Sequence, residues 1–136
     1  MNEILRGDHI VPAIALKDLA IALAMAVFAG AMLPGGVALP GNPDDTIQHG
    51  LAFATLTATF RMAWPGVAWM HHFVLMATIG GAMELVQLVP ALHRDASVAD
   101  WLVDVAASLA TLTGLGLGRV CRLILARRLS SLPHTR

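Results

Sequence analysis

The chain has 136 residues, of which 57% are hydrophobic and only 13% are charged. Soluble domains carry roughly 25% charged residues, so the composition favours a protein in lipid. The formal net charge of zero argues against a nucleic-acid partner, which selects a basic surface. Each membrane crossing needs about 20 apolar residues, so a chain of this length holds a few crossings and no separate soluble domain. We therefore expect one domain, residues 1–136.

The first apolar segment, about residues 19–39, follows the basic residue Lys17 and predicts a membrane-spanning helix. A signal peptide has a similar layout, but Val37-Ala38-Leu39 is a poor cleavage site, so a retained helix is favoured. Pro40 begins a loop rich in Pro, Gly, Asn and Asp, which are residues that break helical pairing.

Three further helices are expected, at about 45–63, 68–89 and 98–125. The tight turn at Trp64-Pro65-Gly66 separates the first two, and Pro90 ends the second. Ser97 and Asp100 have the spacing of a capping box at the start of the last helix. Open sheet is excluded in lipid because unpaired backbone groups there are costly. The predicted fold is all-α, an integral membrane bundle of four transmembrane helices.

The basic residues indicate the orientation of this bundle, because Lys and Arg beside a membrane helix tend to stay in the cytoplasm. With four crossings, Arg94 is the only Lys or Arg on one side. The others all fall on the opposite side: Arg6, Lys17, Arg61, Arg119, Arg122, Arg127, Arg128 and Arg136. We expect a multi-pass protein of the inner (plasma) membrane with both termini in the cytoplasm.

Polar residues from three predicted helices gather at the extracytoplasmic end. Helical spacing places several of them on shared faces: Asp45 with His49, Glu84 with Gln87, and Asp100 with Asp104 and Ser108. The candidate ligand-binding residues are Asp45, His49, Glu84, Gln87, Arg94, Ser97, Asp100 and Asp104.

Burial in lipid decides how these residues should be arranged. An ionised side chain at membrane depth costs about 2.5–3.5 kcal/mol, so Glu84 and Asp104 should face the bundle interior and find partners. Arg94 is the expected partner, and its fork could instead hold an external phosphate or carboxylate. A purely structural alternative also exists, in which Ser97 and Asp100 cap a helix and an Arg94–Glu84 ion pair fixes a loop.

Metal and cofactor chemistry is not indicated by the spacing. One His with several carboxylates could hold a hard divalent ion, but the cluster has no His-x-x-His or Glu-x-x-His pair and Arg94 would compete with a cation. We expect no metal and no cofactor. Gly80 and Gly81, and also Gly114 and Gly118, are predicted to be close-packing positions between helices.

Two stretches make the chain resemble the VanZ-like family, small membrane proteins named after an accessory factor in teicoplanin resistance. They are Asp45-Thr46-Ile47-Gln48-His49-Gly50-Leu51-Ala52-Phe53, and the series Glu84-Leu85-Val86-Gln87, Pro90, Arg94, Ser97, Asp100 and Asp104. The sequence departs from the family pattern at Thr46, where Lys is common, at Asp104, where Asn is common, and at Ser108, where Gly is common. The resemblance implies a cell-envelope role and a link to glycopeptide tolerance.

Two functions are compatible with the polar end. The leading one is a non-enzymatic envelope protein whose pocket binds a lipid headgroup, a cell-wall precursor or another membrane protein. The alternative is a membrane hydrolase or transferase acting on a lipid-linked substrate, with His49 as general base and Glu84 or Asp104 as acid or metal ligand. A proton or ion pathway is disfavoured because the cytoplasmic half of the predicted helices offers few polar relays.

Overall fold

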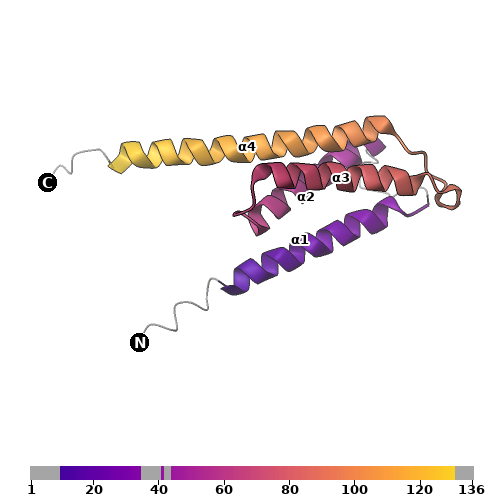
Figure 1. The fold of residues 1–136 in the computed structure, drawn as a ribbon, viewed down its shortest axis with the longest axis horizontal. Helices are drawn as coiled ribbons and strands as arrows, with labels where there is room; N and C mark the ends of the chain where they lie inside the picture. The colour runs from indigo at the N-terminus through magenta and orange to yellow at the C-terminus, as the bar shows by residue number, and fades with distance from the viewer. Residues whose placement is uncertain (1–9, 35–40, 42–43, 131–136) are drawn as a thin grey trace.

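The computed structural model describes residues 10–34, 41 and 44–130. Within these ranges the chain is all-helical and contains no strand, which confirms the predicted all-α class. The elements in order are α1 (Ile10–Ala31), α2 (Asp45–Ala63), α3 (Trp69–Gln87), the short 3₁₀ helix η2 (Pro90–Leu92) and α4 (Val98–Ser130). The first turn of α1 and the last turn of α4 lie at the same end of the molecule, and α4 extends past the other helices there (Figure 1).

The predicted bounds hold closely for α2 and α3, whereas α4 continues past its predicted end at about 125 to Ser130, and the bounds are wrong for α1. α1 begins nine residues before the predicted start and ends at Ala31. Pro34 accounts for the early end, because the residue before a proline is pushed out of the α region. Lys17 and Asp18 lie inside the helix rather than before it, so charge was a poor marker of its start. Residues 35–39 of the predicted helix lie outside the described residues.

α2 is the central helix, and it packs against α1, α3 and α4. Phe53 and Leu56 of α2 meet Met76 and Met83 of α3 in a small apolar core. Leu23 and Val27 of α1 are among the partly buried residues that pack against this core. The apolar core is therefore small, and it leaves most of the large hydrophobic side chains outside.

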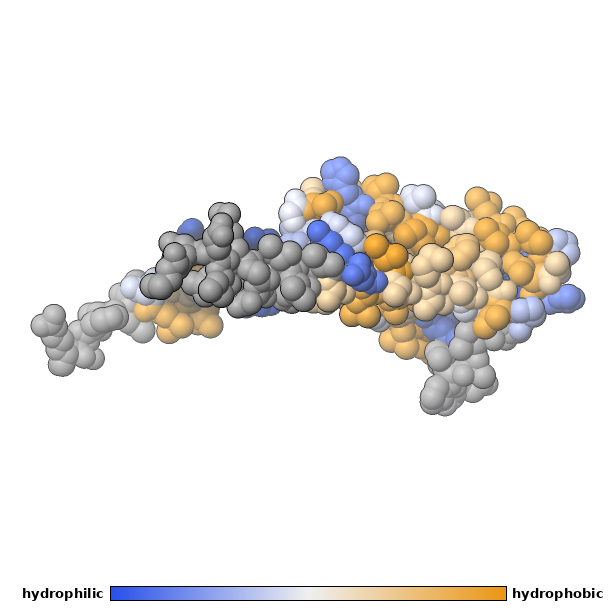
Figure 2. All heavy atoms as spheres, turned by 90° about the horizontal axis from the view of Figure 1, so that it is seen from below, coloured by the Kyte–Doolittle hydropathy of each residue, from blue (hydrophilic) through white to orange (hydrophobic). Residues whose placement is uncertain are grey.

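The distribution of polarity is the reverse of that expected in water. Among the described residues, buried polar and charged residues outnumber buried hydrophobic ones, whereas large hydrophobic side chains are exposed on all four helices. Figure 2 shows hydrophobic residues covering much of the visible helical body. By length and composition, α4 is the one helix in the described ranges that could cross a membrane. Four crossings are therefore not established by this criterion.

Two of the predicted glycine contacts are present and two are absent. A Cβ atom on Gly80 would lie 2.9 Å from Oδ2 of Asp104 and 3.3 Å from the Trp101 ring, and one on Gly81 would touch the same ring at 3.5 Å. α3 and α4 therefore pack closely at these glycines, as predicted. Gly114 and Gly118 have open space where a Cβ would be, so the prediction is wrong for them in this single chain.

Candidate functional site

A seam of polar side chains joins α2 to α4. Its three contacts are Thr46 Oγ1 to Asp100 Oδ1 at 2.7 Å, His49 Nδ1 to Asp104 Oδ1 at 3.1 Å, and Thr57 Oγ1 to Ser108 Oγ at 3.0 Å. The predicted stripe of acids and serine on α4 is confirmed as a buried face. Thr46 and Thr57 were missed as partners, although the 46, 49, 53, 57 spacing places them on the face of α2 that carries His49.

His49 and Asp104 form the centre of the seam. Their side chains are only 7% and 0% exposed. Because an ionised carboxylate can only accept hydrogen bonds, Nδ1 of His49 carries the proton in this contact, and in the neutral ring Nε2 is then an acceptor. Asp104 thus fixes both the orientation and the tautomer of the ring. Gly80 lies directly against the Asp104 carboxylate, so no larger residue fits there without a shift.

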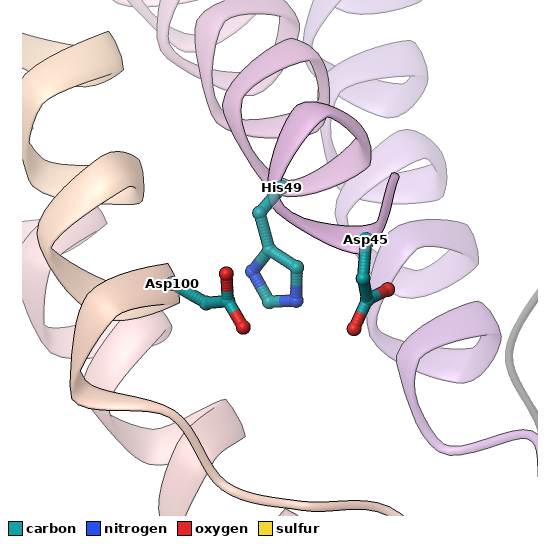
Figure 3. Close-up of side chains that lie close together, drawn as sticks. All are labelled: Asp45, His49 and Asp100. Atoms are coloured by element: carbon teal, nitrogen blue, oxygen red, sulfur yellow. The ribbon is translucent and has the colours of Figure 1, made fainter. Parts of the chain in front are cut away.

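Two further carboxylates lie beside the His49 ring. In Figure 3 the imidazole of His49 lies between the carboxylates of Asp45 and Asp100, with a ring nitrogen toward each. Asp45 opens α2 and Asp100 lies in the first turn of α4. Negative charge in a first helical turn is favoured by the helix dipole, which accounts for both acids at these positions.

Glu84 reaches from α3 to the start of α4. Its Oε2 accepts a hydrogen bond of 2.6 Å from the backbone N–H of Ser97. Ser97 Oγ in turn accepts from the backbone N–H of Asp100 at 3.2 Å, which is half of the predicted capping box. Glu84 takes the role that the Asp100 carboxylate would have in the other half. Oε1 of Glu84 is buried, and it is the one buried side-chain polar atom in the described residues without a hydrogen-bond partner.

Arg94 binds Asp45, and the predicted pair with Glu84 is wrong. Nη2 of Arg94 lies 2.9 Å from Oδ2 and 3.1 Å from Oδ1 of Asp45. Arg94 follows η2 in a loop beside the first turn of α2, whereas Glu84 is deeper and engaged at the start of α4. The arginine therefore pairs with a carboxylate that is 47% exposed and not with a buried one.

Gln87 makes a hydrogen bond to another helix. Its Nε2 donates to the carbonyl oxygen of Ala31 at 3.2 Å. Ala31 is the last residue of α1, where carbonyl groups lack intrahelical partners. Gln87 therefore ties the end of α3 to the end of α1. The backbone N–H of Ser97 is likewise used within the protein, where it donates to Glu84.

A cavity of about 270 Å³ opens between α1 and the polar end of α2. Its apolar lining comes from α1, α2 and α3, with Ala26, Val27, Gly30, Ala31, Ala52, Phe53 and Met83, and its polar lining is Asp45, Gln48, His49 and Arg94. Three of the eight predicted site residues thus line the cavity: Asp45, His49 and Arg94. The other five lie around it in the seam and the helix ends. The cavity has the mixed character of a site for an amphiphile.

Two overlapping sets of side chains also place possible metal-ligand atoms together. In each set, one ligand atom per residue lies within 4.8 Å of the others: Asp45, His49 and Asp100 in one, and His49, Glu84 and Asp104 in the other. The second set is buried throughout. Sequence spacing could not reveal either set, because each joins different helices.

Comparisons with known proteins add no relative to this picture. No family model matches the chain, and searches of curated proteins and of solved structures find no match. The VanZ-like resemblance accordingly stays a prediction based on the residues quoted for it.

Proposed function

We propose that the chain is a VanZ-like integral membrane protein of the cell envelope, with four membrane-spanning helices and both termini in the cytoplasm. The inside-out distribution of polarity supports this: charged residues such as Asp104 are buried while hydrophobic residues are exposed on every helix. Ionisable residues in membrane proteins face the bundle interior because a charged side chain exposed to the hydrocarbon is costly. An even number of crossings is supported by the start of α1 and the end of α4 lying at one end (Figure 1).

The function we propose is binding of an amphiphilic ligand, a lipid headgroup or a lipid-linked cell-wall precursor, in the cavity between α1 and α2. The observation that carries the proposal is the lining of this cavity. Val27 and Phe53 provide an apolar wall for a chain, and Asp45, His49 and Arg94 provide a polar end for a head. In the membrane, this combination matches a molecule that lies partly in the hydrocarbon and partly in the headgroup region.

The polar lining of the cavity indicates which kind of headgroup would bind. Arg94 uses Nη2 for Asp45, so among the described residues its Nη1 and Nε have no partner and can donate to a phosphate oxygen. Nε2 of His49 and the exposed face of Asp45 can accept from hydroxyl groups. A phosphate that carries a polyol or sugar satisfies both demands. A link to glycopeptide tolerance rests on the family resemblance alone.

A cavity-filling variant tests this function. Ala26 is an exposed residue of α1 in the cavity lining, and Ala29 is an exposed residue of α1 outside it. We expect a short-chain phosphatidylglycerol to raise the melting temperature of the detergent-purified wild type and of Ala29→Phe, and not of Ala26→Phe. Glycerol phosphate without chains should stabilise less. Equal stabilisation of both variants would show that the lipid acts on the outer surface of the bundle.

A second candidate is hydrolysis or group transfer on a lipid-linked substrate, and the His49–Asp104 contact favours it. Asp104 holds Nδ1 and leaves Nε2 as a general base, the arrangement in which a carboxylate orients a catalytic histidine. Turnover of a lipid phosphate that is lost in His49→Gln, with ligand-induced stabilisation retained, would separate this activity from binding alone.

A further inference from the structure

The buried carboxylates lack a matching positive charge. Glu84, Asp100 and Asp104 are 8%, 9% and 0% exposed. Arg94 is engaged by the more exposed Asp45, and Asp100 accepts from the uncharged hydroxyl of Thr46. Among the described residues, His49 is the one side chain with a possible positive charge for which a contact with a buried acid is seen. Buried carboxylates in proteins are paired, bind metal ions or hold protons, so these acids need either a counterion or protons.

Glu84 supplies an independent sign of a ligand. Its Oε2 is held by Ser97, while Oε1 is buried without any hydrogen-bond partner in the described residues. A buried acceptor left without a partner is unfavourable and calls for an explanation, such as an ion bound beside it. The side chain is 92% buried, since 8% of it is exposed, and it lies in the set that includes His49 and Asp104.

We infer that His49, Glu84 and Asp104 form a binding site for a divalent transition-metal ion, Mn²⁺ or Zn²⁺. The ligands would be Nδ1 of His49, Oε1 of Glu84 and a carboxylate oxygen of Asp104, and the ion would displace the proton that Nδ1 donates to Asp104. Metal–ligand distances near 2.0–2.2 Å put neighbouring ligand atoms roughly 3–3.5 Å apart. Nδ1 of His49 and Oδ1 of Asp104 are 3.1 Å apart, and one possible ligand atom from each of the three residues lies within 4.8 Å of the others.

The ligand chemistry decides the class of ion. Two carboxylates balance a charge of +2, and one imidazole nitrogen favours a transition metal over Mg²⁺ or Ca²⁺, which prefer oxygen ligands alone. The surroundings hold the ligands in place. Ser97 fixes Glu84 through Oε2, as outer hydrogen bonds commonly do for metal-binding carboxylates, and Gly80 leaves room for Asp104. The site uses the ion alone and does not depend on the proposed amphiphile.

The test is a Mn²⁺ titration of the chelator-treated, detergent-purified full chain, followed by the electron paramagnetic resonance signal of free Mn²⁺. We expect one ion per chain in the wild type, displaced by Zn²⁺ and not by an equal concentration of Mg²⁺. Glu84→Gln and Asp104→Asn should each weaken binding by at least about tenfold. Asp95→Asn, an exposed acid outside both sets, is the matched control and should bind as the wild type does.

Two results would overturn the inference. The first is absence of binding by the folded wild type at millimolar Mn²⁺ and Zn²⁺, which would mean that protons balance the buried acids. The second is binding that survives Glu84→Gln and is lost in Asp45→Asn, which would place the ion among Asp45, His49 and Asp100. Circular dichroism monitors folding, and if Asp104→Asn does not fold, Glu84→Gln decides, because its amide oxygen can still accept from Ser97. Amphiphile binding is measured separately, so either proposal can fail alone.

Discussion

The two halves of α4 have opposite environments although they belong to one continuous helix. The first half, from Val98 to Leu112, buries Asp100, Asp104 and Ser108 against α2. The second half, from Thr113 to Ser130, is almost entirely exposed, and its exposed residues include hydrophobic side chains such as Leu117 and Ile124. Polar side chains are thus buried where a neighbouring helix offers partners, and apolar ones are exposed where none packs.

This difference separates two sources of stability. The first half depends on specific contacts, and losing a single buried partner there should be costly. The side chains of the second half are exposed and pack against no neighbouring helix. Substitutions there should therefore have little effect on the free energy of unfolding. Free energies of unfolding, measured by titrating SDS into mixed micelles, test this difference and the strength of the individual contacts.

The largest effect is expected for Asp104→Ala. Loss of this carboxylate leaves the buried His49 ring without its partner and opens a gap beside Gly80, so we expect a loss of about 3 kcal/mol. Thr113→Ala on the second half removes only a hydroxyl bonded to its own helix, at the Leu109 carbonyl. Its cost should stay within about 0.5 kcal/mol. Similar costs for the two variants would contradict the proposed contrast.

Gly80→Ala should be the next most damaging. The new Cβ would approach Oδ2 of Asp104 to 2.9 Å and separate α3 from α4, and overpacking of this kind costs about 2 kcal/mol. Gly116→Ala in the second half meets no neighbour and gains helix propensity, so it should stabilise by up to about 1 kcal/mol. The two glycines are expected to respond with opposite signs.

A smaller loss is expected for Thr46→Val. The valine preserves the shape of the side chain but removes the donor to Asp100, for a cost of about 1 kcal/mol. Thr55→Val is the matched control, because the Thr55 hydroxyl is exposed and bonds only to the Leu51 carbonyl of its own helix. If Thr55→Val were the more costly of the two, the cross-helix bond of Thr46 would not contribute to stability.

The smallest effect is expected for Arg94→Gln. The Arg94–Asp45 pair is partly exposed, with Asp45 at 47%, so its loss should cost only about 0.5 kcal/mol. Salt should reduce this difference further, because the ion pair is accessible to screening. An effect as large as that of Asp104→Ala, unchanged by salt, would mean that Arg94 also balances the buried acids.

Sequence reasoning located the helices and the polar end better than the pairing within it. The bounds of α2 were predicted correctly because turn-forming residues flank it on both sides. The four-residue spacing of Asp100, Asp104 and Ser108 revealed the buried face of α4. The partner of Arg94 could not be deduced, since Asp45 and Glu84 both belong to the polar end and only the depth and register of three helices distinguish them.

The same limit applies to the buried set of possible metal ligands. His49, Glu84 and Asp104 come from α2, α3 and α4, so no motif with a fixed spacing contains them. The end of α1 was missed for a different reason. Hydrophobicity continues past Pro34, and backbone sterics rather than side-chain polarity end the helix there.

The central claim, a bundle in lipid with its polar end facing outward, is tested most directly by cysteine labelling in intact cells of an expression host. In a Cys121→Ser background, single cysteines would replace Leu51, Val74 and Leu109, which are exposed on α2, α3 and α4, and Asp95 in the polar loop. A membrane-impermeant maleimide should label only Asp95→Cys before the cells are dissolved in SDS. Ready labelling of the other three, or protection of Asp95→Cys in intact cells with labelling after lysis, would contradict the account.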